Sequence, residues 1–273
     1  MNRPPAITEL TGSGQLGTIT LDWKPVSWAT VVDHYAVYVL ADGSYELAGK
    51  TVYPHFVHRG LGFTGVTRSY RVVTVDAAGN RSRPSATVAA TNLTSVTVSG
   101  TSLARVGEFD GKGSELALSP GGYASYPTRF PSDVDFTFGT STPSADWSYL
   151  LPGPADKWAG SKNHRATFRF DLAAVPAQDL DLALWLIDSH ASLAGTALLT
   201  VNGTEVGRLT FANGATKGST IADSTYPGSP LKPSYLEKPL SRALFKEGPN
   251  VIELFKDNGS WIAYDALGIY ARK

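Results

Sequence analysis

Residues 197–211 read ALLTVNGTEVGRLTF, and this stretch decides the fold class. The apolar run Ala197–Val201 meets the dipeptide Asn202-Gly203, which is followed by a second run, Glu205–Phe211. Asn-Gly between two such runs is the strongest short-range signal for a two-residue β-hairpin, because both turn residues must adopt positive φ. The stretch therefore predicts two antiparallel strands joined by a tight turn.

Strand signals of the same kind surround this hairpin in the C-terminal half of the chain. They lie at Asp133–Gly139, Arg165–Leu172, Leu182–Asp188, Asn250–Lys256 and Trp261–Tyr270. No long stripe of helical period interrupts them. Many short strands separated by turn signals favour a sandwich, so we predict a jelly-roll β-sandwich over residues 133–273.

The N-terminal third shows a second set of alternating runs. They are Thr18–Trp23, His34–Leu40, Tyr70–Asp76 and Thr87–Ala89, and they predict a smaller sandwich over residues 1–93. Residues 94–132 are rich in Gly, Ser and Tyr and have little period, so we interpret them as an irregular connection packed on the second module. The predicted fold class is all-β, in two modules.

The first module also carries a recognisable residue pattern. Its members are Trp23 on an early strand, Tyr35 and Tyr38 on the next, and the series Tyr70, Val72, Val75, Asp76, Gly79, Ser82, Pro84 and Ser85. With this pattern, residues 5–92 resemble a fibronectin type III domain. The resemblance implies that Trp23 packs in the core and that Tyr70 makes a corner bond between strands. It also implies a spacer, although the fold alone fixes no role.

Residues 138–267 carry a second ordered set of motifs. They are Phe138-Gly139-Thr140-Ser141, Asp146-Trp147-x-Tyr149, Phe168-x-Phe170-Asp171-Leu172, Leu198-x-x-Val201-Asn202-Gly203, Asp223-Ser224-Thr225-x-x-Gly228, then Leu244, Gly248, Asn250 and Ile252, and finally Tyr264-Asp265-x-Leu267. In this order they resemble the C-terminal carbohydrate-binding-like domain of family 4 rhamnogalacturonan lyases. Those enzymes join a catalytic β-sandwich, a fibronectin-III-like domain and this jelly roll.

The resemblance implies that this chain has a non-catalytic role. The family's catalytic lysine and histidine belong to the domain that is missing here, so we assign no catalytic residue to this chain. We expect a carbohydrate-binding or targeting portion of a secreted polysaccharide-degrading protein, with an upstream catalytic domain as a partner. The expected ligand is a pectin-type glycan, either rhamnogalacturonan or its side chains.

Composition agrees with a neutral or sparsely charged partner. The 24 Lys and Arg residues balance 24 Asp and Glu residues, whereas nucleic acids and anionic membranes attract basic surfaces. The absence of Cys excludes disulfides and thiolate metal sites. No apolar run is long enough for a transmembrane helix. We expect an exported monomer that binds neither nucleic acid nor membrane.

Two motifs that suggest cofactors are better explained structurally. Gly12–Gly17 matches G-x-G-x-x-G, but a strand follows it where a dinucleotide site needs a helix, so it is interpreted as a flexible turn. His55 and His58 follow Pro54 on an extended segment and lack further ligands for zinc.

The alternate-residue aspartate pairs, Asp133 with Asp135 and Asp179 with Asp181, are more typical of solvated or turn-capping groups than of a glycosidase dyad. We therefore expect no cofactor and no metal, with a structural calcium left as an alternative.

The candidate binding residues combine rings with polar groups near loops. Sugar sites pair aromatic rings, which stack on the apolar C–H face, with a few polar groups for the hydroxyls. We predict a face made of Trp158, His164, Arg165, Asp188, His190, Tyr226 and Tyr235. The rings of Trp23, Trp147, Trp185 and Tyr264 are predicted to be core.

Two other functions stay open at this stage. A lyase would need a base and a charge neutraliser, which His164 with Arg165, or His190 with Lys162, could supply. Alternatively, both modules could be structural supports that present an apolar surface to a catalytic domain.

Overall fold

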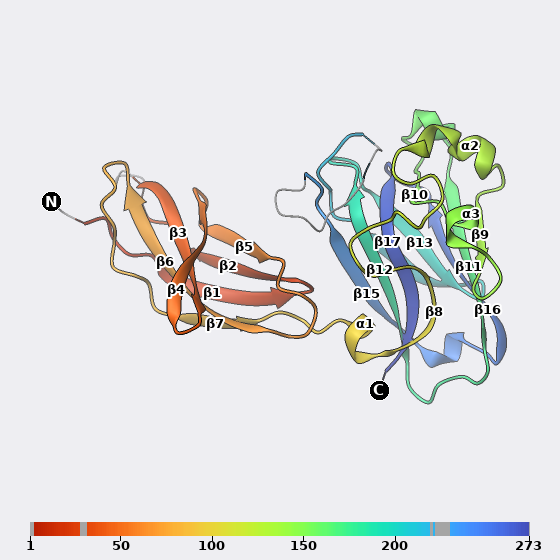
Figure 1. The fold of residues 1–273 in the computed structure, drawn as a ribbon, viewed down its shortest axis with the longest axis horizontal. Helices are drawn as coiled ribbons and strands as arrows, with labels where there is room; N and C mark the ends of the chain where they lie inside the picture. The colour runs from red at the N-terminus through yellow and green to blue at the C-terminus, as the bar shows by residue number, and fades with distance from the viewer. Residues whose placement is uncertain (1–2, 28–31, 219–220, 222–229, 273) are drawn as a thin grey trace. The chain divides into compact units, whose positions relative to one another are not determined.

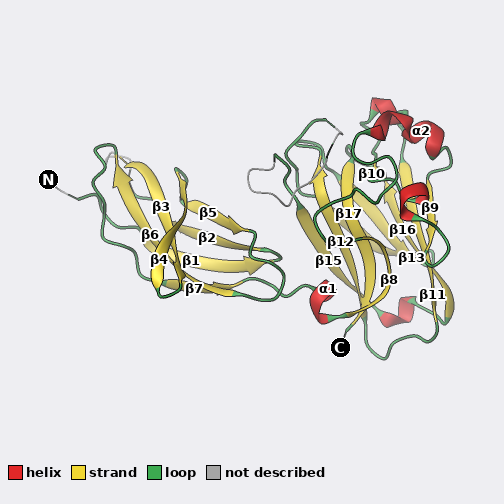
Figure 2. Cartoon of the chain, viewed as in Figure 1, coloured by secondary structure: helices red, strands yellow, loops and turns green. Residues whose placement is uncertain are grey.

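The computed structural model describes residues 3–27, 32–218, 221 and 230–272. The chain divides into two compact units, Met1–Val98 and Ser99–Lys273, coloured red to yellow and yellow to blue in Figure 1. Strands dominate both units, and the helices are single turns (Figure 2). Within the described ranges, no helix is long and apolar enough to cross a membrane. The all-β prediction is confirmed.

The first unit is a sandwich of two antiparallel sheets. One has the order β1-β2-β5, made of Thr8–Gln15, Thr18–Lys24 and His55–Arg59. The other has the order β4-β3-β6-β7, made of Ser44–Thr51, Val32–Ala41, Thr67–Asp76 and Val88–Thr91. Alternation along the strands explains this arrangement, since every second side chain of β2 and β6 turns toward the opposite sheet.

The core of the first unit contains the residues that carry the fibronectin-type pattern. Trp23 is 6% exposed and meets the Tyr35 ring edge-on, with 5.3 Å between ring centroids. Tyr70 on β6 is fully buried, and its hydroxyl lies 2.9 Å from Nδ1 of His58 on β5. The predicted core position of Trp23 and the inter-strand bond of Tyr70 are both confirmed, and that bond joins the two sheets.

The second unit is a larger sandwich. Its first sheet has the order β10-β17-β12-β15, with β8 also paired to β17. These strands are Leu150–Leu151, Ile262–Ala271, Leu180–Ser189, Ser234–Leu240 and, for β8, Thr101–Gly107. Residues 94–132, predicted as an irregular connection, thus contribute β8 to this sheet, where Arg105 lies opposite Gly268.

The second sheet of this unit has the order β14-β13-β16-β11-β9. Its strands are Thr204–Thr210, Thr196–Val201, Gly248–Lys256, His164–Leu172 and Val134–Thr137. The hairpin predicted from residues 197–211 is confirmed as β13 and β14, which pair through Val201 and Thr204. Asn202 and Gly203 both have positive φ, at 50° and 79°, as a two-residue turn of this type requires.

The helices are single turns, namely α1 (Val96–Ser99), η1 (Gly122–Ser125), α2 (Tyr126–Arg129), α3 (Pro143–Asp146), η2 (Lys157–Ala159) and η3 (Arg242–Leu244). Of these, α1 spans the boundary between the two units and the others belong to the second unit. The core between the sheets holds the predicted rings of Trp147 and Tyr264, each 1% exposed, 5.2 Å apart between centroids.

Candidate functional site

The predicted binding residues are distributed over separate parts of the second unit. Tyr226 lies outside the described residues, so nothing is assigned to it. The other six occupy the sandwich interior, one loop end and the outer faces of both sheets.

His164 and Trp158 face the interior near α2. His164 is 1% exposed, with Nδ1 lying 3.0 Å from Asp133 Oδ1 and Nε2 lying 3.1 Å from the Ala159 carbonyl oxygen. Trp158 packs against the core, and its ring and that of His164 both contact the Tyr126 ring edge-on. The prediction of His164 as a surface ligand is wrong, because the inward side chains of β11 begin with this residue.

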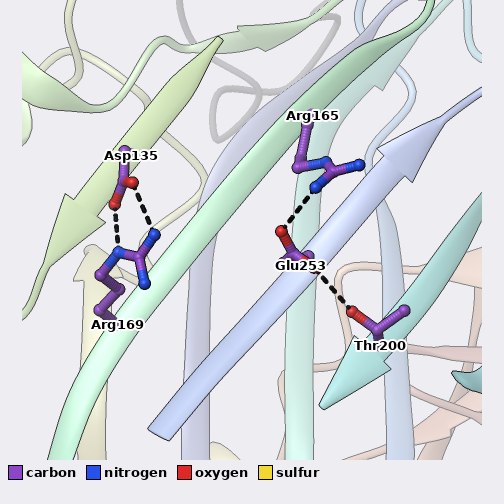
Figure 3. A network of polar contacts seen from close by, with 5 residues as sticks. All are labelled: Asp135, Arg165, Arg169, Thr200 and Glu253. Atoms are coloured by element: carbon purple, nitrogen blue, oxygen red, sulfur yellow. Dashed lines mark hydrogen bonds and ion pairs between the residues drawn. The ribbon is translucent and has the colours of Figure 1, made fainter. Parts of the chain in front are cut away.

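Arg165, the next residue, points to the outer face of the same sheet. Its Nη1 donates to Glu253 Oε1 at 2.9 Å, and Thr200 donates to the other oxygen of that carboxylate at 3.2 Å. Figure 3 shows this group beside the two-bond ion pair between Arg169 and Asp135. Arg165 and Arg169 therefore already have carboxylate partners.

Asp188 and His190 lie at the end of β12. Asp188 is fully buried and Oδ1 accepts from the backbone N–H of Ala215 at 2.8 Å, while burial raises the pKa of this carboxyl. His190 Nδ1 accepts from the backbone N–H of Leu193 at 3.1 Å, and its ring meets Trp261 edge-on. The prediction of Asp188 as a sugar ligand is wrong, because its carboxylate binds the backbone of a neighbouring loop.

Tyr235 lies on the outer face of the other sheet. Its ring stands 4.9 Å from that of Trp185, its neighbour across β15 and β12. Trp185 is 3% exposed, as predicted for a buried ring, but it lies on the outer side of the sheet, since Leu184 and Leu186 occupy the inner core. The six residues therefore do not form one face.

A pocket of about 230 Å³ lies elsewhere in the second unit, between β8 and β9. These are edge strands of the two opposing sheets, so the pocket opens on the side of the sandwich. Its lining consists of Arg105, Gly107, Glu108, Glu115, Phe136, Phe138, Gly139, Ser141 and Pro143. We call it the Phe138 pocket.

Phe138 supplies an exposed aromatic ring to this pocket. Val134 and Phe136 on β9 turn into the core and are each 2% exposed, whereas Phe138 follows the last strand residue and is 44% exposed. Its backbone N–H still donates to the Arg169 carbonyl oxygen at 2.8 Å, so the backbone is held against β11. The ring is thus presented to solvent by a fixed backbone.

A compact turn fixes the chain immediately after this ring. The Ser141 N–H donates to the Thr137 carbonyl oxygen at 2.8 Å, and Ser141 Oγ accepts from the Thr137 N–H at 3.0 Å. Gly139 within this turn has φ of 82°, a conformation that favours glycine. The motif Phe138-Gly139-Thr140-Ser141 therefore builds one wall of the pocket.

The opposite wall carries the charged groups. Arg105 Nη2 donates to Glu108 Oε1 at 2.9 Å, and the Glu108 N–H donates to Glu115 Oε1 at 2.8 Å. Arg105 and Glu108 have side chains 43% and 56% exposed, so their remaining donors and acceptors can reach a ligand. Burial raises the pKa of the Glu115 carboxyl, with Asp110 and Glu108 adding to the effect.

The segment between these residues is anchored to β17. Oδ1 of the buried Asp265 accepts from the backbone N–H groups of Gly111 at 3.0 Å and Lys112 at 3.1 Å. Gly107 approaches β17 so closely that a Cβ there would lie 2.4 Å from the Asp265 carbonyl oxygen. The charged wall is therefore held in place by buried contacts.

The pocket has the composition of a sugar-binding site. Its lining combines an exposed ring with a guanidinium and two carboxylates, and these groups suit the C–H face and the hydroxyls of a sugar. The lining contains neither His nor Lys, and His164 and Arg165 point to opposite sides of their sheet, which contradicts that pair as a lyase site. Among the described residues, no group of three or more His, Asp or Glu side chains could hold a metal ion.

The sequence contained one signal for this pocket. Phe138 and Gly139 stand at the end of a strand pattern, where an aromatic ring can lie at the edge of a sandwich. Arg105, Glu108 and Glu115 gave no signal, because they lie in the stretch predicted as an irregular connection.

Solved structures with similarity to part of the chain include fibronectin type III proteins and a glycan-degrading enzyme. FN3tt is 21% identical over 34% of this chain and 97% of its own, with a TM-score of 0.28. An Fn3-like protein from Clostridium thermocellum is 20% identical over 33% of this chain and 93% of its own, with a TM-score of 0.29. A beta-1,2-glucanase from Parabacteroides distasonis is 26% identical over 34% of this chain and 13% of its own, with a TM-score of 0.28.

A comparison with curated proteins found no match to this chain. The family model described as "CBM-like: Polysaccharide lyase family 4, domain III" matches residues 102–269, which is more than half of the chain and includes both walls of the Phe138 pocket. This chain belongs to the family of CBM-like domains of polysaccharide lyase family 4, domain III.

Proposed function

We propose that this chain is the non-catalytic, glycan-binding portion of a secreted polysaccharide-degrading protein, and that the Phe138 pocket holds a pectin-type glycan. The observation that carries the proposal is the 44% exposed ring of Phe138 opposite the charged wall of Arg105, Glu108 and Glu115. The ring lies on a fixed backbone beside hydrogen-bonding groups, which is the combination that sugar-binding sites use. Membership of a carbohydrate-binding-like family supports the same function.

The first unit is proposed to act as a spacer. It has its own core around Trp23 and Tyr70 and is a separate compact unit. In this proposal the spacer connects the glycan-binding unit to a catalytic domain that acts on the retained polymer.

Binding through a single pocket of this kind should be weak. A dissociation constant of about 1 µM to 1 mM corresponds to about 8 to 4 kcal/mol of binding free energy. Repeated contacts along a polymer would raise the apparent affinity.

Affinity electrophoresis of the full chain in gels that contain rhamnogalacturonan, galactan or arabinan tests the proposal. We expect retardation by at least one of these glycans. Unchanged migration in all of them would contradict the proposal. The same mixtures followed by ultraviolet absorbance report any unsaturated product, and its appearance would mean that the chain itself is a lyase.

A further inference from the structure

The charged groups of the Phe138 pocket do not balance. Among the lining residues, Arg105 is the cation, and Glu108 and Glu115 are the anions. The guanidinium of Arg105 is already bonded to Glu108 at 2.9 Å. One carboxylate, that of Glu115, is therefore left without a cationic partner within the lining.

A further acidic group, Asp110, lies in the loop between Glu108 and Glu115. Asp110 Oδ1 accepts from the Lys112 N–H at 2.9 Å, in the loop that Asp265 anchors. Asp110 and Glu108 raise the pKa of Glu115, in addition to the effect of burial. The negative charge of these carboxylates also repels any anion that enters the pocket, because repulsion between like charges is strong where water is partly excluded.

A neutral sugar meets no such repulsion. Its hydroxyls can donate to the oxygens of Glu108 and Glu115 and accept from the remaining N–H groups of Arg105, while its C–H face covers Phe138. A uronate places a carboxylate beside Glu115 with no unpaired arginine or lysine in the lining to receive it.

From this arrangement we infer that the Phe138 pocket selects neutral glycan chains and rejects chains rich in uronic acid. The inference rests on the proposed function and names the ligand class of the same site. In a pectin-type polymer it assigns binding to neutral side chains of the galactan or arabinan kind, and not to the acidic backbone.

Calorimetric titration of the full chain with galactan, arabinan and polygalacturonate, at neutral pH and low salt, tests this selectivity. We expect at least tenfold tighter binding of a neutral polymer than of polygalacturonate. Polygalacturonate binding equal to or tighter than that of the neutral polymers would overturn the inference and leave the proposed function standing. The absence of binding to any of the glycans would overturn both.

The variant Glu115→Gln tests whether the charge of this carboxylate causes the selectivity. The substitution keeps the side-chain oxygen that accepts from Glu108 N–H and removes the excess negative charge. We expect polygalacturonate binding to strengthen severalfold while binding of the neutral polymer changes by less than about twofold. Glu205→Gln is the matched control, because it removes the same charge from the exposed strand β14, at the opposite edge of the sheet from β9. Equal effects of the two substitutions, or no effect of Glu115→Gln on polygalacturonate binding, would overturn the inference.

Discussion

Arg105 on β8 and Phe138, which directly follows β9, line the same pocket, although β8 and β9 are edge strands of opposite sheets of the second sandwich. The loop that follows β8 contributes Glu108 and Glu115 to the lining of this pocket. That loop carries the carboxylates of the site, and Asp265 on β17 fixes it through two backbone hydrogen bonds. The stability of this loop and the binding properties of the pocket are therefore connected.

Asp265 should make the protein less stable as the pH rises from about 4 to about 8. Burial and the neighbouring Asp110 raise its pKa to about 8 in the folded chain, against about 3.9 when unfolded. Between these values the folded state holds a proton that the unfolded state has released, so this contribution to stability falls as the pH rises.

Asp265→Asn removes that contribution, because the amide stays neutral and keeps one oxygen for Gly111 and Lys112. Thermal melts at pH 5 and pH 8 should show the wild-type midpoint falling relative to that of Asp265→Asn. Asp171→Asn, on an exposed position of β11, serves as the control. A wild-type midpoint that rises relative to Asp265→Asn over this interval would contradict the assignment.

The bond between Tyr70 and His58 should stabilise the first unit. Tyr70→Phe removes the hydroxyl that lies 2.9 Å from His58 Nδ1 and leaves that part-buried nitrogen without this partner. The expected loss is about 1 to 2 kcal/mol of unfolding free energy. Urea denaturation measures it, and Tyr53→Phe, at a tyrosine that is 70% exposed, should change stability little. Equal effects of the two substitutions would argue against a role for the bond.

Lys256 should contribute stability through hydrogen bonds inside the second unit. Its fully buried Nζ donates to the carbonyl oxygens of Ala194 at 2.6 Å and Asn258 at 2.7 Å. Lys256→Met leaves both oxygens without this donor, and we expect a loss of about 2 kcal/mol at pH 7. Lys246→Met, at an exposed position, is the control.

The pH dependence of this loss has a defined sign. Burial lowers the pKa of Lys256 to about 8 in the folded chain, against about 10.4 in the unfolded one. Over this interval the unfolded state binds the extra proton, so wild-type stability rises with pH and the gap to Lys256→Met should widen. Chemical denaturation at pH 7.5 and pH 10 measures both variants, and a gap that narrows would contradict the account.

Local sequence signals predicted much of the fold. The hairpin at Asn202-Gly203 needs only its own turn geometry and two flanking strands, so the sequence predicts it directly. The burial of Trp23 and Trp147 follows from apolar strand patterns and family motifs. β8 was harder to predict, because pairing with β17 joins residues more than 150 positions apart.

The candidate site could be predicted far less well. His164 and Arg165 were both proposed as ligands, yet adjacent residues on a strand must face opposite sides. Asp188 was proposed as a ligand because it ends a strand near a loop, but a loop that is distant in the sequence and adjacent in space buries its carboxylate. The Phe138 pocket depends on the meeting of two sheet edges and on a loop held by Asp265, and neither is encoded in a local pattern.

The central claim is that the exposed ring of Phe138 holds a glycan, and calorimetric titration of two variants tests it most directly. The titrant is the glycan that the wild-type chain binds best. Phe138→Ala removes the ring, whereas Leu193→Ala removes a side chain that is 52% exposed elsewhere in the same unit. We predict at least tenfold weaker binding by Phe138→Ala, about 1.4 kcal/mol, and unchanged binding by Leu193→Ala. Wild-type affinity in Phe138→Ala would contradict the account.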